Sequence, residues 1–226
     1  MANHVCHYLN HLSLPYVTWA RSTDDTNILA EHLSKSTHVL ILISDSAIDA
    51  FIEKTILFNH SNKKWVHFSG NLISKHAYSA HPLQTFSNAL YLAEDYQKIP
   101  FIVESDGPEF SQLLPGFKNP HYTINKNDKN YYHAMCVIAN NFTTILWQKF
   151  FSEMQNRFAI KTEDLKPYLD QTFHNIKYDY QNALTGPLSR NDKKTMLSDL
   201  NALKDDDFFN IFDAFTKAFI KETIDA

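Results

Sequence analysis

The stretch His38-Val39-Leu40-Ile41-Leu42-Ile43-Ser44-Asp45 decides the fold class of this chain of 226 residues. Five large apolar side chains follow one another and end at a serine and an aspartate. Such a continuous run is typical of a strand buried on both faces, as in a parallel sheet covered by helices. Asp45 is a suitable N-cap, and apolar residues recur after it with helical spacing, at Ile48, Phe51, Ile52 and Ile56. The stretch therefore predicts a strand followed by a helix, the repeating unit of α/β sheets.

The residues on both sides of this stretch continue the alternation. Residues 2–14 and 28–33 have apolar side chains at helical spacing. Residues 16–19, 65–68 and 101–103 are short runs of β-branched, aromatic and aliphatic residues, which predict strands. Strands that alternate with helices predict a mostly parallel sheet.

The chain changes character after residues 107–120, a stretch rich in glycine and proline. From there onward the apolar spacing is helical, and one long helix is predicted over residues 128–158. The last helix would carry a stripe that indicates core or subunit packing, made of Phe208, Phe212, Phe215 and Phe219. We therefore predict an α/β domain over residues 1–108 and an all-α domain over residues 109–226.

Composition and charge argue against several function classes. The net charge of -4 and the pI of about 6.3 do not favour binding to nucleic acid or to an anionic membrane, because both attract basic surfaces. No apolar run approaches the ~20 residues that span a bilayer, and the first residues do not resemble an export signal. Cys6 and Cys136 lie far apart, which fits a reducing compartment, so we expect a cytoplasmic protein.

A metal site is also considered at the N-terminus. His4, His7 and His11 recur at a spacing that can hold a metal ion, with Cys6 nearby. The same segment offers no carboxylate ligand, and histidines are common on helix surfaces, so we predict no metal site. The sequence contains no GxSxG, HExxH or P-loop pattern, and acyl or phosphoryl transfer is therefore unsupported.

Polar residues follow three of the predicted strands, where open α/β sheets bind their ligands. Arg21 and Ser22 follow the first strand; an arginine there suits the 2′-phosphate of NADP, and an ordinary surface arginine is an equal alternative. Ser44 follows the central run. Ser69 and Gly70 follow the next strand, where a glycine allows a ligand to approach the backbone. These five residues are candidate cofactor-binding residues.

Candidate catalytic and substrate-binding residues come from three later segments. His81 and Gln84 lie in His81-Pro82-Leu83-Gln84-Thr85-Phe86, a polar group between turn formers that suits a pocket wall. His133 shares a helix face with Asn140, seven residues on, and Asn141 lies close to that face. A histidine beside an amide can protonate and orient a carbonyl or imine during hydride transfer, and a hydrogen-bonded core histidine is the alternative interpretation.

The last polar cluster follows in the helical half. Arg190 comes after Thr185-Gly186-Pro187 and can anchor an anionic substrate, whereas Asp192 is interpreted as a helix cap.

These motifs, taken in order, resemble a known family. His67-Phe68-Ser69-Gly70, the 81–86 segment, Tyr132-His133-Ala134 and the segment from Ala183 to Pro187 are similar to the Rossmann-like proteins that carry the domain of unknown function 2520. These proteins are relatives of the pyrroline-carboxylate reductase and hydroxyacid dehydrogenase superfamily. The similarity spans nearly the whole chain.

The resemblance implies a Rossmann-like domain that binds NADP and a helical C-terminal domain that forms a homodimer. It implies oxidoreductase chemistry on a small-molecule substrate in a cleft between the two domains. Carried over by motif, the residues that line this cleft are Ser69, His81, His133, Asn141, Thr185 and Arg190. A non-catalytic dimeric binding or scaffold module with a vestigial cofactor site is the alternative.

The sequence departs from the family pattern at its start. Family members begin with a strand and a G-x-G-N-x-A loop, whereas Met1-Ala2-Asn3-His4-Val5 resembles only the end of that loop, with Ala2 as its last small residue. We therefore expect an incomplete Rossmann-like sheet that lacks the first strand and the glycine loop. Two explanations stay open: a misplaced start, or a shorter product in which cofactor binding is weak or lost.

Overall fold

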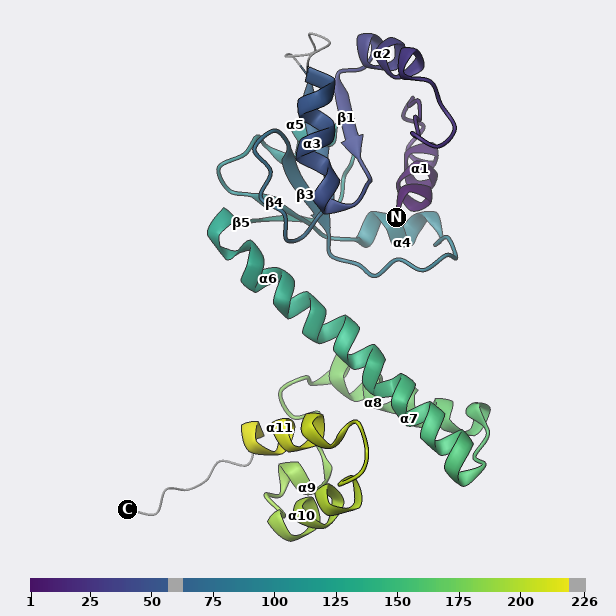
Figure 1. Cartoon of the computed structure of the whole chain (residues 1–226), viewed down its shortest axis with the longest axis vertical. Helices are drawn as coiled ribbons and strands as arrows, with labels where there is room; N and C mark the ends of the chain where they lie inside the picture. The colour runs from purple at the N-terminus through teal and green to yellow at the C-terminus, as the bar shows by residue number, and fades with distance from the viewer. Residues whose placement is uncertain (57–62, 220–226) are drawn as a thin grey trace. The chain divides into compact units, whose positions relative to one another are not determined.

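The computed structural model describes residues 1–56 and 63–219 of the chain (Figure 1). Its strands form one five-stranded sheet in the order β1-β2-β3-β4-β5. The strands are β1 (His38–Ile41), β2 (Lys64–His67), β3 (Tyr78–Pro82), β4 (Phe101–Glu104) and β5 (His121–Ile124). Neighbouring strands are parallel except β3 and β4, which are antiparallel. The predicted α/β class with a mostly parallel sheet is confirmed.

Helices from the first part of the chain cover both faces of this sheet. They are α1 (Ala2–His11), α2 (Thr26–Lys35), α3 (Asp45–Ile56), α4 (Ala93–Lys98) and α5 (Phe110–Leu113). Val66 of β2 packs into one core with residues of α1, α4 and α5, while the adjacent Trp65 packs into the other with residues of α2 and α3. Successive side chains of a strand point to opposite faces, so one short strand supplies both cores.

The strand predicted at residues 16–19 is wrong, because Tyr16–Ala20 is irregular. Among the described residues, no strand pairs with this segment, and an apolar run without a partner strand does not form a ladder. Local contacts hold it instead: Trp19 Nε1 donates to the carbonyl of Asp25, and its ring stacks on Phe51 with centroids 6.0 Å apart.

Two strands were not predicted. β3 carries a serine, a histidine and a proline among its five residues, so it lacks the apolar alternation of a strand. Ser79, Ala80 and Pro82 are nevertheless buried, because β2 and β4 flank the strand on both sides. β5 pairs with β4 at the edge of the sheet and is largely exposed.

The long helix predicted over residues 128–158 is present as three consecutive segments. They are α6 (Lys129–Cys136), a π-helical segment η2 (Val137–Phe142) and α7 (Thr143–Phe158), preceded by the 3-10 turn η1 (Lys126–Asp128). A π turn takes about one residue more than an α turn. The hydroxyl of Thr144 donates to the carbonyl of Asn140 at 2.8 Å, which satisfies one of the acceptors at the irregular turn.

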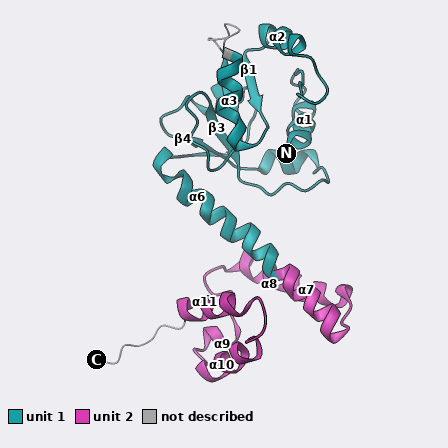
Figure 2. Ribbon diagram, viewed as in Figure 1, with its two compact units in different colours: residues 1–146 teal, residues 147–226 magenta. Residues whose placement is uncertain are grey.

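The chain divides into two compact units, residues 1–146 and 147–226 (Figure 2). The first unit extends past the boundary expected at residue 108, because β5 joins the sheet and α6 follows it. The second unit is helical in its described part. Besides α7, its helices are α8 (Thr162–Tyr178), α9 (Gly186–Ser189), α10 (Lys193–Ala202) and α11 (Phe209–Phe219).

Lys149 joins segments of the second unit, since its ammonium group bonds Asp206 and Asp207 at 2.9 Å each. In the part of the chain that the structure describes, none of the helices combines the length and the apolar character needed to cross a membrane.

Candidate functional site

A cavity of about 300 Å³ lies at the carboxyl ends of β1 and β2. Its walls combine apolar side chains with several polar ones that converge in it. The lining residues are Met1, Ile41, Leu42, Ile43, Asp45, Ile48, Phe68, Ser69, Gly70, His81 and His133. Four of the residues predicted from sequence are therefore brought together here: Ser69, Gly70, His81 and His133.

The two histidines meet over Gly70, which follows β2. A Cβ atom placed on Gly70 would lie 2.9 Å from Cδ2 of His133 and 3.0 Å from Nε2 of His81. Both distances are shorter than a normal van der Waals contact, so only a residue without a side chain leaves room for the two rings. His81 comes from β3 and His133 from α6, and the missing side chain at position 70 allows sheet and helix to place both imidazoles at one point.

Burial sets the protonation state of His81. It lowers the pKa of this imidazole from 6.5 to about 4, and the positive charges of His133 and Lys129 lower it further while Asp45 opposes them. His81 is therefore neutral near pH 7. A neutral imidazole carries one N–H donor and one acceptor nitrogen, so His81 can polarise a carbonyl or an imine without bringing a charge into the cavity.

Asp45 is the carboxylate of the cavity. It is the first residue of α3, and Ser69 donates a hydrogen bond to its Oδ2 at 2.5 Å. The same serine oxygen accepts the N–H groups of Asn71 and Leu72, at 3.2 and 2.9 Å. These bonds fix the turn after β2 and hold Asp45 and Ser69 together at the cavity wall.

A buried polar layer lies behind the cavity. Lys129, the first residue of α6, pairs with Glu104 of β4 at 2.8 Å, and their side chains are 2% and 3% exposed. The lysine also donates to the carbonyl of Leu72. His67 is fully buried, and its pKa falls to about 4, first through burial and then through the charge of Lys129. This layer ties the start of α6 to the sheet and so positions His133.

Asn141 lies in the π-helical segment of the same helix. In an uninterrupted α-helix, residues seven apart share a face, which would pair His133 with Asn140. A π turn contains one extra residue, so across it residues eight apart share a face. Asn141 therefore lies on the side of the helix that carries His133. Asn141 is exposed, and its catalytic role stays a prediction.

The other predicted cofactor residues lie outside the cavity lining. Ser44 is exposed just before α3, and Arg21 and Ser22 are exposed in the turn after the irregular segment. Ala2 is the first residue of α1, next to Met1, which does line the cavity. The start of α1 is therefore at the cavity edge, whereas the contribution of Arg21, Ser22 and Ser44 stays a prediction.

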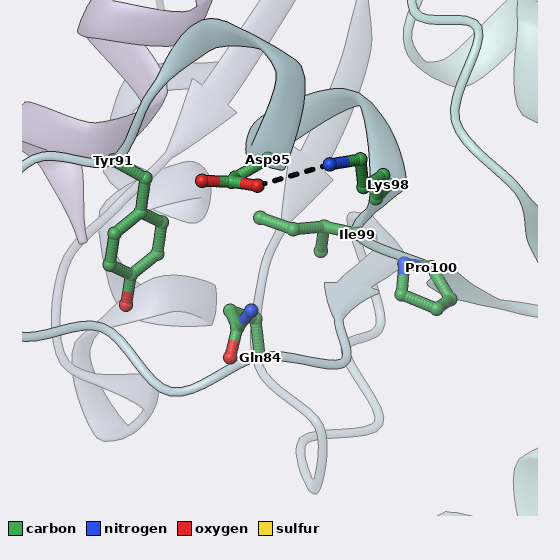
Figure 3. Close-up of a pocket in the computed structure, with 6 residues that line it drawn as sticks. All are labelled: Gln84, Tyr91, Asp95, Lys98, Ile99 and Pro100. Carbon is green, nitrogen blue, oxygen red and sulfur yellow. Dashed lines mark hydrogen bonds and ion pairs between the residues drawn. The ribbon is translucent and has the colours of Figure 1, made fainter.

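Gln84 lines a different hollow, of about 400 Å³, on the same unit. Figure 3 shows its lining, which is Gln84, Tyr91, Asp95, Lys98, Ile99 and Pro100. Lys98 and Asp95 form an ion pair there at 3.3 Å. Thr185 and Arg190 are exposed residues of the second unit, and their substrate-binding role stays a prediction.

Sequence reasoning missed two polar groups of this region. Asp45 follows β1 together with Ser44, where ligands bind such sheets, but the sequence pattern assigns only the serine to the cofactor. Tyr132 was overlooked beside His133; its hydroxyl lies 2.7 Å from Nδ1 of His81. Among the described residues, no group of three or more potential metal ligands comes together. His7 and His11 form only a pair, with their Nε2 atoms 2.9 Å apart.

Three solved structures illustrate the similarity of the fold. A Bacteroides fragilis protein provisionally named NADP oxidoreductase BF3122 matches with a TM-score of 0.75 and 19% identity, over 97% of this chain and 93% of that one. Protein TM1727 from Thermotoga maritima matches with a TM-score of 0.65 and 21% identity, over 94% and 91%. An imine reductase from Streptomyces aurantiacus matches with a TM-score of 0.57 and 13% identity, over 96% and 89%.

The comparison with curated proteins gave no significant match. The comparison with family models matched residues 99–219, which include β4, β5, α6 with Tyr132 and His133, and the helices up to α11. The matching model is the domain of unknown function DUF2520, and it covers more than half of the chain. The chain therefore belongs to the DUF2520 family, with a Rossmann-like α/β sheet and a helical C-terminal region.

Proposed function

We propose that this chain is an NADP-dependent oxidoreductase that reduces a small carbonyl or imine substrate. The observation that carries the proposal is the convergence of His81 and His133 on Gly70, in a cavity that Asp45 also lines, at the carboxyl ends of parallel strands. Cofactors and substrates of open α/β sheets bind at this edge. The similarity of the fold to a protein named as an NADP oxidoreductase and to an imine reductase supports the same function.

The residues around the cavity fit part of a nicotinamide dinucleotide. α1 starts at the cavity edge with Ala2, and the first N–H groups of a helix are free to bind phosphate oxygens. The carboxylate of Asp45 suits ribose hydroxyls, and Gly70 permits a ring to approach the backbone. Arg21 is the predicted partner of the 2′-phosphate that distinguishes NADP from NAD.

The roles of the side chains follow from this arrangement. A nicotinamide cofactor bound there would supply the hydride. His81 donates a hydrogen bond to the oxygen or nitrogen on which negative charge develops, and His133 lies close enough to serve the same atom. Asn141 would orient the substrate, whereas the substrate-binding role of Thr185 and Arg190 stays a prediction.

NADPH titration of the full chain tests the proposal, with binding followed by calorimetry and turnover by loss of NADPH absorbance on small cyclic imines and ketones. We expect NADPH to bind more tightly than NADH. Arg21→Ala should weaken NADPH binding by roughly tenfold and leave NADH binding unchanged, because a charge-assisted phosphate bond is lost. Gly70→Ala should weaken both cofactors and abolish turnover, since its Cβ would displace the two histidines.

Lys98→Ala is the matched control, because Lys98 lines the other hollow and should leave binding and turnover unchanged. If neither dinucleotide binds, and Arg21→Ala and Gly70→Ala have no effect, the chain is not an oxidoreductase. The non-catalytic dimeric module would then be the better account.

We also propose that the protein is a homodimer. The helix formed by α6, η2 and the start of α7 exposes large apolar side chains: Tyr131, Met135, Ile138, Phe142 and Ile145. A series of exposed apolar side chains along one helix is typical of a contact surface. Light scattering during size exclusion should give twice the chain mass of 26.2 kDa, and Ile138→Glu should shift it toward the monomer. A wild-type monomer at micromolar concentration would contradict the proposal.

A further inference from the structure

His81 and Tyr132 form a hydrogen bond between the sheet and α6. Nδ1 of His81 lies 2.7 Å from the hydroxyl oxygen of Tyr132, and the rings meet edge to face with centroids 5.6 Å apart. In the described part of the chain, the cavity lining includes His81 but not Tyr132. The tyrosine can therefore reach a bound molecule only through the histidine.

The direction of this hydrogen bond determines which nitrogen of His81 carries the proton. His81 is neutral near pH 7, so one ring nitrogen donates and the other accepts. The pKa of Tyr132 is raised, first by burial and then by Cys136, so its phenol keeps its proton. A phenol is a good donor and an imidazole nitrogen a good acceptor. If the hydroxyl of Tyr132 donates to Nδ1, the proton of the neutral His81 is on Nε2.

Nε2 is the nitrogen that faces the cavity. It is the atom of His81 that would lie 3.0 Å from a Cβ on Gly70, and Gly70 itself lines the cavity. We propose that Tyr132 is a positioning residue that holds His81 in the Nε2–H tautomer and so presents an N–H donor to the substrate oxygen or nitrogen. The role toward the substrate rests on the proposed reductase function; the tautomer does not.

The donor direction matters for the chemistry. When a hydride reaches a carbonyl or imine carbon, negative charge develops on the attached oxygen or nitrogen. An N–H already aimed at that atom stabilises the charge, whereas the other tautomer would aim a lone pair at it and repel it. Tyr132 thus excludes the unproductive tautomer by occupying Nδ1.

Long-range 15N–1H correlation NMR of the full chain at pH 7 tests the tautomer, with the His81 signals identified by their loss in His81→Gln. We expect a protonated Nε2 and an unprotonated Nδ1 in the wild type. In Tyr132→Phe, the Nδ1–H form should become populated, because its hydrogen-bond donor is gone. Tyr122→Phe is the matched control; Tyr122 lies on β5 and is 63% exposed, and its loss should leave the spectrum of His81 unchanged.

Turnover of 2-methyl-1-pyrroline with NADPH gives the second measurement. Tyr132→Phe should lower kcat by roughly tenfold or more and change KM little, because the substrate still fits while the donor is no longer fixed. An Nδ1–H tautomer in the wild type overturns the proposal even if the variant does not fold. An unchanged tautomer in a folded Tyr132→Phe also overturns it. If the tautomer behaves as expected and no imine or ketone is reduced, the reductase function fails and the positioning of His81 by Tyr132 stands.

Discussion

Lys129→Met should destabilise the first unit by about 3 kcal/mol, because it leaves the carboxylate of Glu104 buried with a weaker partner. The ammonium group of Lys129 pairs with Glu104 at 2.8 Å in a nearly dry environment, and burial lowers the pKa of the lysine. Lys126 remains 3.8 Å from the other oxygen of Glu104 and keeps the loss at the lower end of the range for broken buried pairs. Urea unfolding of variants that also carry Trp147→Phe, followed by tryptophan fluorescence, measures the free energy of unfolding of the first unit.

Two further variants separate charge burial from packing. Lys126→Met removes a partly exposed lysine that pairs with Asp106 at 3.0 Å, and it should cost less than about 1 kcal/mol. Lys129→Met combined with Glu104→Leu removes both buried charges and should recover most of the stability lost in the single variant. A double variant that is no more stable than Lys129→Met would contradict this account and would point to packing of the lysine stem instead.

The first unit should lose stability as the pH falls from about 6.5 to 4. His67 and His81 each have a pKa near 4 in the folded protein and 6.5 as the ordinary value, so in this window the unfolded chain binds more protons than the folded one. Their contribution is fully present above pH 6.5 and is lost on the way to pH 4. For the fully buried His67 the loss amounts to about 3 kcal/mol, and for the partly exposed His81 it is smaller.

Urea midpoints of the first unit between pH 7.5 and 4.5 measure this effect, on the order of 1 kcal/mol per pH unit in the steep part. His67→Gln keeps an acceptor for the N–H of Ser69 but cannot titrate, so its stability should depend less on pH. His174→Gln, at an exposed position of the second unit, is the control and should behave as the wild type. Equal pH dependence of His67→Gln and the wild type would show that acid lability arises elsewhere.

The sequence was sufficient to predict a strand or helix where its apolar side chains are also the buried ones. The run at residues 39–43 predicted β1, and the spacing after Asp45 predicted α3, because Ile41 of the strand and Ile48 and Ile52 of the helix are buried in one core. The same logic failed at Tyr16–Trp19, whose strand-like composition has no neighbouring strand to pair with among the described residues. It also missed β3, whose strand conformation is imposed by its two neighbours rather than by its own residues.

In the candidate site, too, some residues could be predicted from the sequence and others could not. Ser69, Gly70, His81 and His133 were predicted from motifs and do converge. The contacts of Asp45 and Tyr132 could not be predicted, because they depend on tertiary distances: 2.5 Å from Asp45 to Ser69 and 2.7 Å from Tyr132 to His81. Gln84 was grouped with His81 by proximity in sequence. The turn after β3 instead places it at a separate hollow.

The surplus residue of the π turn rotates everything after it by about 100° around the helix axis relative to Lys129 and His133. The contacts that hold α6 on the sheet are therefore independent of which side chains lie on the same side of the helix as His133. Inserting or deleting one residue in Val137–Phe142 would therefore change which asparagine lies on the side of His133. The buried ion pair between Lys129 and Glu104 would stay intact.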